Sequence, residues 1–279
     1  MKIKIGKALD QGFQVLFKNP VVLAPFVGLA AIQYFFYQYT LWPMMKSFQN
    51  IPGFNNDFNL PMVSPVGAQI MPNWPITPDF SGIPFRDDVL YPFALTASIF
   101  TNILKVMPFL ALGLVIGIIL YLAAIRLIAE TAKNNPPNLG SALILGLKKF
   151  IPIIISGILS MAMIMIGYVF LILPGLYLTI RFMFFVQAAM IDDQGIISSL
   201  DKSWQVTRGN WWRSLGIIVI PTVVAGIIGT MMGAILPLFT SPASNLVTVI
   251  VNTFFMAWVM GVTITAYLQI HEPEEPGQA

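Results

Sequence analysis

The chain has 279 residues, of which 57% are hydrophobic and only 10% are charged. Soluble domains average about 25% charged residues, so this composition excludes an ordinary soluble globular protein and indicates a membrane protein. The net charge of +3 is small, and the absence of cysteine excludes disulfides, thiolate nucleophiles and cysteine metal sites.

Residues 1–20 form the first amphipathic segment, which has no cleavage site typical of a secretory signal peptide. The segment carries too many charges to span a bilayer, so we expect a helix that lies in the membrane interface. The alternative is a helix packed against a soluble partner. Its apolar stripe, at helical spacing, is Ile5, Leu9, Phe13 and Leu16, and its cations are Lys4, Lys7 and Lys18.

Residues 21–40 predict the first span, because about 20 apolar residues cross the ~30 Å hydrocarbon core. Residues 41–92 are rich in Pro, Asn and Asp and have no helical period, so they predict a long extracytoplasmic loop. The loop contains many aromatic residues, which disordered segments usually lack. We therefore expect a compact cap that could contact a membrane or external protein partner. The alternative is a disordered linker.

The rest of the chain alternates apolar runs with shorter amphipathic segments. Lys148 and Lys149 close the second amphipathic segment, and Lys202, Trp204 and Arg208 lie in the third. Pro174-Gly175 predicts the turn between spans 3 and 4, since Pro suits the first position of a turn and Gly accepts a positive φ. The predicted order is span 2 in 93–132, amphipathic helix 138–149, spans 3 and 4 in 151–191, amphipathic helix 195–209, spans 5 and 6 in 211–270, and tail 271–279.

A distinct pattern of residue types surrounds the predicted hairpin of spans 3 and 4. It reads Pro174-Gly175-x-Tyr177-x-x-x-Arg181, then Asp193, then Ser199-x-x-x-Ser203-Trp204, then Gly209-Asn210-Trp211. This pattern resembles a family of poorly characterised multi-pass membrane proteins that includes the membrane domain of some glycerophosphoryl diester phosphodiesterases. The resemblance implies a membrane architecture. The soluble catalytic domain of those phosphodiesterases is absent here, which argues against transferring their activity.

The placement of Lys and Arg predicts the orientation of the chain. Eleven cations flank the spans on one predicted side, against three on the other, and Arg181 lies inside span 4. Because cytoplasmic loops carry an excess of Lys and Arg, both termini and the three amphipathic helices are predicted to be cytoplasmic, in the cell membrane. The eleven are Lys2, Lys4, Lys7, Lys18, Arg126, Lys133, Lys148, Lys149, Lys202, Arg208 and Arg213, and the three are Lys46, Arg86 and Lys105.

The amphipathic segments also resemble one another. Residues 9–19 (LDQGFQVLFKN) and 200–210 (LDKSWQVTRGN) are identical at five of eleven positions, and residues 143–153 keep two bulky apolar residues in register. Each segment precedes two spans, so the pattern predicts three repeated units related by an axis along the membrane normal. The alternative is convergence among interfacial helices. The predicted fold class is therefore an all-α integral membrane protein with six transmembrane helices, three cytoplasmic in-plane amphipathic helices and a candidate threefold repeat.

The sequence offers little chemistry. No P-loop, dinucleotide or zinc motif occurs, and the only histidine, His271, lies in the tail. We therefore predict no catalytic residue, metal or cofactor. Arg181 is the one residue that the sequence singles out, because a cation inside a span is costly and is usually paired or faces a polar cavity. We expect it to contact outer headgroups, loop acids such as Asp87 or Asp88, or a carbonyl, with a transport pathway as the alternative.

Three functions remain open from the sequence. The first is a non-enzymatic membrane protein that organises lipid or a partner complex at the cytoplasmic leaflet, and nucleic acid is not an expected partner. The second is a transporter or permease subunit with Arg181 near the pathway. The third, a lipid-modifying enzyme, depends only on the family resemblance. The structural or ligand-contact candidates are Pro174, Gly175, Tyr177, Arg181 and Asp193. The candidates for interfacial lipid or partner contact are Lys4, Lys7, Lys18, Lys148, Lys149, Lys202, Trp204, Arg208 and Trp211.

Overall fold

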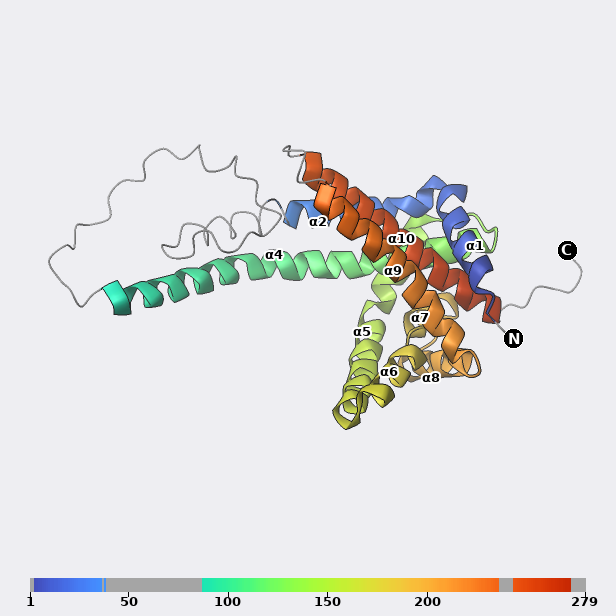
Figure 1. The fold of residues 1–279 in the computed structure, drawn as a ribbon. Helices are drawn as coiled ribbons and strands as arrows, with labels where there is room; N and C mark the ends of the chain where they lie inside the picture. The colour runs from blue at the N-terminus through green and yellow to red at the C-terminus, as the bar shows by residue number, and fades with distance from the viewer. Residues whose placement is uncertain (1–2, 37, 39–86, 236–242, 272–279) are drawn as a thin grey trace, which may run out of the picture.

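A computed structural model of the chain describes residues 3–36, 38, 87–235 and 243–271, and this part is all-helical (Figure 1). The predicted cap up to residue 86 and the tail from residue 272 lie outside the described residues. The elements are α1 (Ile5–Lys18), η1 (Pro20–Leu23), α2 (Ala24–Phe36), α4 (Asp87–Ala132), α5 (Leu139–Phe170), α6 (Ile172–Arg181), α7 (Phe185–Ile191), α8 (Ile196–Thr207), α9 (Trp211–Ile235) and α10 (Ala243–His271).

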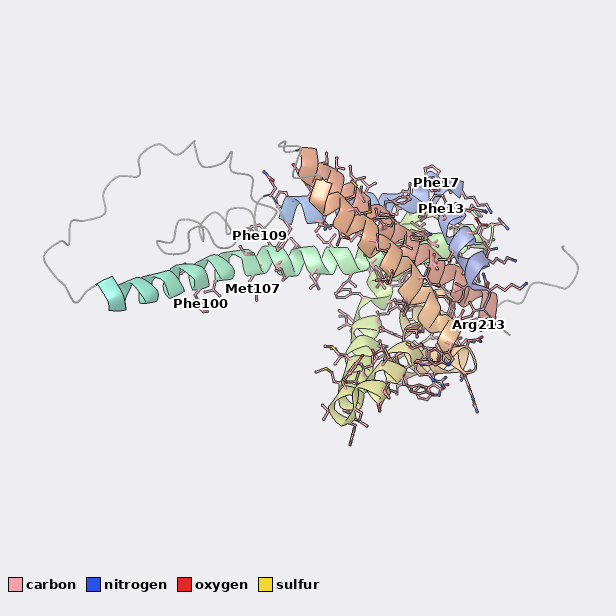
Figure 2. All side chains as sticks on the ribbon, viewed as in Figure 1. Phe13, Phe17, Phe100, Met107, Phe109 and Arg213 are labelled. Atoms are coloured by element: carbon pink, nitrogen blue, oxygen red, sulfur yellow. The ribbon has the colours of Figure 1, made fainter. Side chains whose placement is uncertain are left out.

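Several of these helices are long and apolar enough to cross a membrane, as the composition predicts. Five stretches meet that test alone, and a sixth does so if α1 and η1–α2, which meet at a bend of 100°, are taken together. Large apolar side chains along α4 are exposed, among them Phe100, Met107 and Phe109 (Figure 2). Such a surface is stable in lipid and unfavourable in water. The five stretches are Val106–Ala132, Leu139–Phe170, Ile172–Ile191, Trp211–Met232 and Leu246–Ile270.

Helix α4 begins at Asp87, so the predicted end of the loop at residue 92 is wrong. Two adjacent acids, Asp87 and Asp88, occupy the first turn of the helix. The helix has 46 residues, or about 69 Å at 1.5 Å per residue, which is more than twice the thickness of the ~30 Å hydrocarbon core.

The second amphipathic segment is not a separate helix, which corrects the prediction for residues 138–149. Helix α5 runs without a break from Leu139 to Phe170 and contains Pro152. Asn138 caps its start, since the Asn138 side-chain oxygen accepts a hydrogen bond from the Ser141 N–H at 3.1 Å. No glycine or capping residue lies between Lys148 and Pro152, so nothing local ends the helix before the apolar run begins.

The turn between α5 and α6 is at Leu171, three residues before the predicted turn. Leu171 is extended (φ −168°, ψ 157°), and Pro174-Gly175 lies in the first turn of α6. Pro is tolerated there because the first helical N–H groups have no partner within the helix. Gly175 is required by close contact and not by a positive φ, since a Cβ at this position would lie 2.4 Å from the Tyr168 ring.

The predicted continuous span 4 is broken between α6 and α7 at residues 182–184. The Phe185 N–H donates to Phe182 O, so the Arg181 carbonyl has lost its helical donor. Ser203 of α8 replaces that donor, with Ser203 Oγ 2.7 Å from Arg181 O. The same Oγ accepts from the Phe184 N–H at 3.1 Å. One serine from another helix therefore satisfies both backbone groups that the break releases.

The main core forms where α4, α7 and α10 meet. Its buried residues include Ile125 and Ile128 of α4, Met190 of α7 and Ile264 of α10, all 0–1% exposed. Helix α1 contributes Val15 and Leu16 to this core and packs along α10, and the two helices run in opposite directions. The Thr265 Oγ1–H donates to Ala8 O at 3.1 Å, and Gln269 Oε1 accepts from the Lys4 N–H at 3.1 Å.

The buried face of α1 differs from the predicted apolar stripe. Helix α1 buries Ala8, Gly12, Val15 and Leu16, whereas Phe13 is 46% exposed. A Cβ on Gly12 would lie 2.5 Å from the Val262 N of α10, so only glycine allows this approach. Helix packing therefore selected small residues for the contact and left the larger aromatic side chains outside.

Candidate functional site

Arg181, at the end of α6, lies in a cage of aromatic rings and hydrogen-bond acceptors. The residue is 9% exposed. Its Nε–H donates to Tyr177 Oη at 2.8 Å, and its Nη2–H donates to the same hydroxyl. Its Nη1–H donates to Trp204 O at 3.1 Å. Of the three kinds of partner predicted for Arg181, the structure thus shows the backbone carbonyl, which comes from α8.

Aromatic rings supply the rest of this environment. The Arg181 Cζ lies 4.6 Å from the Trp204 ring centroid and 4.9 Å from that of Tyr177. Trp211, at the start of α9, stacks on Tyr177 with centroids 6.2 Å apart. Ring faces attract a cation, and that attraction strengthens when the group is desolvated. The structure therefore brings four predicted residues together and fastens α6, α8 and α9 around Arg181. The depth of Trp204 and Trp211 in a bilayer stays a prediction.

Pro174 and Gly175 belong to the hairpin tip and not to this cage. Gly175 is buried against α5, and Pro174 is exposed. The tip is apolar throughout. Its five most exposed consecutive residues are Val169 (83%), Phe170 (76%), Leu171 (69%), Ile172 (75%) and Leu173 (76%).

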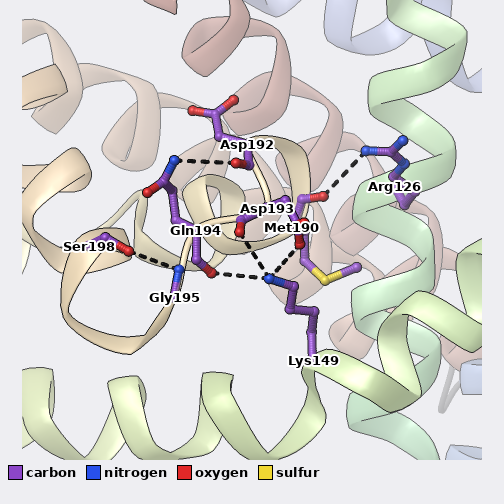
Figure 3. Close-up of polar contacts among 8 residues, drawn as sticks. All are labelled: Arg126, Lys149, Met190, Asp192, Asp193, Gln194, Gly195 and Ser198. Atoms are coloured by element: carbon purple, nitrogen blue, oxygen red, sulfur yellow. Dashed lines mark hydrogen bonds and ion pairs between the residues drawn. The ribbon is translucent and has the colours of Figure 1, made fainter.

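Asp193, in the turn between α7 and α8, pairs with Lys149 of α5 (Figure 3). The Lys149 Nζ lies 2.5 Å from Asp193 Oδ1 and also donates to the Asp193 and Gln194 carbonyls at 3.1 and 3.2 Å. The hydrogen bond and the charge of Lys149 hold the pKa of Asp193 below its ordinary value. Asp193 has a φ of 55°, which Asp and Asn tolerate better than most residues. This pair joins the first part of α5 to the turn that follows α7, at the base of the α5–α6 hairpin.

A second carboxylate in the same turn faces the protein interior. Asp192 Oδ2 accepts from the Tyr267 Oη–H of α10 at 2.5 Å, and Lys202 Nζ lies 4.0 Å from it. The Arg126 Nη1–H of α4 donates to Met190 O at 3.5 Å (Figure 3). The ends of α4, α7 and α10 are thus joined by polar contacts. No group of three or more acidic or histidine side chains suited to a metal occurs among the described residues.

The three predicted amphipathic segments share one buried feature. Each buries two small residues four positions apart, which are Ala8 and Gly12, Ala142 and Gly146, and Ser199 and Ser203. The pairs contact different helices. Gly12 meets α10, and Gly146 meets α4, where a Cβ would lie 3.1 Å from Ile119 O. Ser203 meets the break between α6 and α7. Small residues at this spacing let two helix backbones approach closely.

The outward faces of these segments combine exposed apolar and basic side chains. On α1, Phe13 and Phe17 are 46% and 61% exposed, and their centroids lie 5.0 Å apart (Figure 2). Lys4 and Lys18 are exposed on the same helix, where Lys18 Nζ donates to Asn134 Oδ1. Lys7 is half-buried. In the other two segments the exposed members are Ile144 (58%), Leu147 (62%) and Lys148, then Ile197 (73%) and Arg208.

Sequence reasoning missed the polar side of α8. Ser199, Ser203 and Thr207 are buried, while the neighbouring Ile197 is 73% exposed. Ser199 Oγ–H donates to Ile196 O at 2.9 Å, and Thr207 Oγ1–H to Ser203 O at 2.9 Å, so their own helix satisfies these hydroxyls. The four-residue spacing of the small residues Ser199, Ser203 and Thr207 is the sequence signal that could have identified this buried face.

Comparison with known families gives one match. A family model described as a domain of unknown function, DUF7847, matches residues 89–270, which is 182 of the 279 residues. The chain belongs to the DUF7847 family. The DUF7847 match begins within α4 and ends in α10, so it includes the Arg181 cage and the Lys149–Asp193 pair. No curated protein and no solved structure matches the chain. The resemblance to the phosphodiesterase membrane domain stays a prediction.

Proposed function

We propose that this protein is a non-enzymatic, multi-pass membrane protein whose cytoplasmic face binds anionic lipid headgroups. The observation that carries the proposal is the outward face of its amphipathic segments. Their small residues dock on the protein, while Phe17, Leu147 and Ile197 remain exposed on segments that also carry the exposed cations Lys18, Lys148 and Arg208. An exposed combination of large apolar and basic side chains suits the boundary between acyl chains and headgroups.

Contacts among the basic segments support one cytoplasmic side that includes both ends of the described chain. Lys18 of α1 contacts Asn134, which follows α4. The Arg213 Nη1–H of α9 donates to Ile3 O at 3.3 Å. Segments far apart in the sequence therefore gather their cations in one region. An excess of Lys and Arg on one side of a membrane protein is typical of the cytoplasmic side. We therefore propose that this region faces the cytoplasm at the cell membrane.

The packing of the small residues supports the internal repeat. Residues 139–149 dock on α4, α8 docks on α6–α7, and α1 docks on α10. Each segment thus contacts the second helix of the preceding hairpin, and α1 closes the series by contacting the last hairpin. We infer three units that share one docking device. The transporter alternative is weaker, because the protein itself provides the partners of Arg181.

Removal of exposed cations tests the lipid-binding proposal. Lys148→Gln with Arg208→Gln removes two exposed charges, each of which contributes about 1 kcal/mol near an anionic leaflet. After purification from vesicles of equal phosphatidylglycerol and phosphatidylcholine, mass spectrometry should show roughly thirtyfold weaker retention of phosphatidylglycerol, which corresponds to about 2 kcal/mol. Lys46→Gln with Arg86→Gln is the matched control, because it removes equal charge from the predicted opposite side. Equal retention by the wild type and the first variant would contradict the proposal.

A further inference from the structure

The α5–α6 hairpin has two different surroundings along its length. Its base, at the Lys149–Asp193 pair, adjoins the end of α4, where Arg126 contacts Met190 O at 3.5 Å. Farther along, Tyr177 stacks on Trp211 at the start of α9. Fourteen residues separate Tyr177 from Ile191, where α7 ends, so these two points lie at most about 21 Å apart along helices that are interrupted at residues 182–184. The hairpin therefore joins the end of one apolar helix to the beginning of another.

The end of α4 and the start of α9 both carry charged residues, which favour a position at the boundary between the membrane and water. The end of α4 carries Arg126, Glu130 and Lys133, and the start of α9 is flanked by Arg208 and Arg213. Under the orientation proposed above, both points lie at the cytoplasmic boundary, because α4 enters the cytoplasm and α9 leaves it. Two points that are well separated along one hairpin then share the same depth. A hairpin that crossed the bilayer would place Tyr177 and Trp211 close to its far side.

Helix α8 gives an independent reason. It lies along the hairpin, with Ser156 Oγ of α5 donating to Ile196 O at 3.0 Å and Arg181 of α6 donating to Trp204 O at 3.1 Å. The side of α8 that faces away from the hairpin is polar and exposed. A helix with that face cannot lie along a crossing hairpin within the hydrocarbon core, because charged groups are unfavourable there. Its exposed polar residues are Ser198, Asp201 and Gln205, and exposed Arg208 directly follows the helix, while Ile197, 73% exposed, is the one exposed apolar residue of α8.

The rest of the hairpin is apolar and must avoid water. No charged residue occurs from Phe150 to Ile180. Ile158, Met161 and Val169 are 64%, 62% and 83% exposed. Figure 1 shows the hairpin extending across the direction of α4, with α8 beside it. A polar helix on one side and apolar side chains on the remaining surface match the two sides of a membrane boundary.

We propose that α5, α6 and α8 form a wedge within the cytoplasmic leaflet, where the apolar surface of the hairpin binds acyl chains. The α5–α6 hairpin then does not cross the membrane, and α2, α4, α9 and α10 are the crossing helices. Arg181 and its aromatic cage lie near the headgroups and not at the bilayer centre. The termini stay on one side, since a hairpin within one leaflet returns the chain to the side it left. This inference rests on the orientation in the proposed function.

Single cysteines in this cysteine-free chain test the wedge. Val169→Cys and Leu173→Cys place probes at the tip, where both side chains are more than 75% exposed, so the substitutions disturb little packing. Asn56→Cys and Gly140→Cys are controls for the outer and cytoplasmic sides. Each variant is reconstituted in phosphatidylcholine–phosphatidylglycerol vesicles and treated with a membrane-impermeant maleimide from each side. A fluorophore on the same cysteines reports depth through quenching by lipids with nitroxides at carbon 5 or carbon 12.

The wedge predicts that the tip cysteines stay unlabelled from the outer side, while Asn56→Cys is labelled there. It also predicts at least twofold stronger quenching of the tip by the carbon-5 nitroxide than by the carbon-12 nitroxide. Labelling of the tip from the outer side would show a crossing hairpin and overturn the proposal. Strongest quenching at carbon 12 would place the tip at the bilayer centre and overturn it as well. Failure of the lipid-retention experiment leaves these readouts unchanged, so the two proposals fail separately.

Discussion

Gly12 of α1 and Gly261 of α10 bring the first and last helices of the described chain into backbone contact. A Cβ on Gly261 would lie 2.5 Å from Gly12 O, closer than real Cβ contacts allow. The Thr265 Oγ1–H donates to Ala8 O at 3.1 Å one turn away. The N-terminal helix is thus held against the last apolar helix by close backbone packing, and its aromatic residues stay outside.

Gly261→Ala should therefore destabilise the protein by about 1–3 kcal/mol, as overpacking does. Thermal unfolding in mild detergent, followed by tryptophan fluorescence, measures this. Gly6→Ala is the control on α1, because a Cβ there meets nothing within 4 Å. The control should match or slightly exceed wild-type stability, since alanine favours helix over glycine. A neutral effect of Gly261→Ala would show that α1 is not docked as described.

Arg181→Ala should lower stability by about 2–4 kcal/mol, because it removes charge-assisted hydrogen bonds and the contact with two rings. Arg181→Lys should recover only part of the loss, since an ammonium cannot reproduce the planar fork of donors. Lys148→Ala, at an exposed position, is the control. The thermal midpoint and yield in detergent report the effect. Unchanged stability of Arg181→Ala, together with loss of a transport activity, would favour a pathway role.

Ser203→Ala should cost about 1–3 kcal/mol, because the Phe184 N–H and the Arg181 carbonyl both lose a buried partner. Ile197→Ala on the same helix should have little effect, since Ile197 is 73% exposed. Hydrogen exchange at residues 182–185 adds a local readout. Faster exchange there in Ser203→Ala, but not in Ile197→Ala, is the expected pattern, and equal exchange in both variants would argue against the bridging role of Ser203.

The Lys149–Asp193 pair predicts a pH dependence. The lowered pKa of Asp193 means that the folded protein favours the charged carboxylate. Its contribution to stability is therefore present above the ordinary pKa of 3.8 and is lost as the pH falls through the lower folded value. Asp193→Asn keeps a residue that tolerates positive φ. This variant should show a small decrease in thermal midpoint at pH 7 and a smaller decrease at pH 3, below the ordinary pKa of 3.8. A constant difference at both pH values would contradict the linkage.

The orientation of the chain predicts opposite accessibility for two single cysteines. Asn56→Cys lies in the predicted outer loop, and Gly140→Cys lies at the exposed start of α5. An impermeant maleimide added to intact cells should label the first and not the second, whereas permeabilised cells should show both. This follows from the eleven cations on one side against three on the other. Labelling of both from the same side would contradict the topology.

The sequence by itself determined the all-helical class and the approximate position of most helices that are long and apolar enough to cross a membrane. These features are local, because hydropathy and helical period depend only on neighbouring residues. The same reasoning placed Tyr177, Arg181, Trp204 and Trp211 in one motif, and the structure brings them together. It could not assign their contacts, because two of them come from helices that follow α6 in the chain.

Only the tertiary structure decided which face of each amphipathic helix is buried. Periodicity identified an apolar stripe that includes Phe13, but Gly12 and Ser203 make the contacts with other helices, because close helix packing depends on the shape of the partner helix. The break after Arg181 likewise depends on tertiary contact. There Ser203, from a later helix, supplies hydrogen bonds that a local pattern cannot encode.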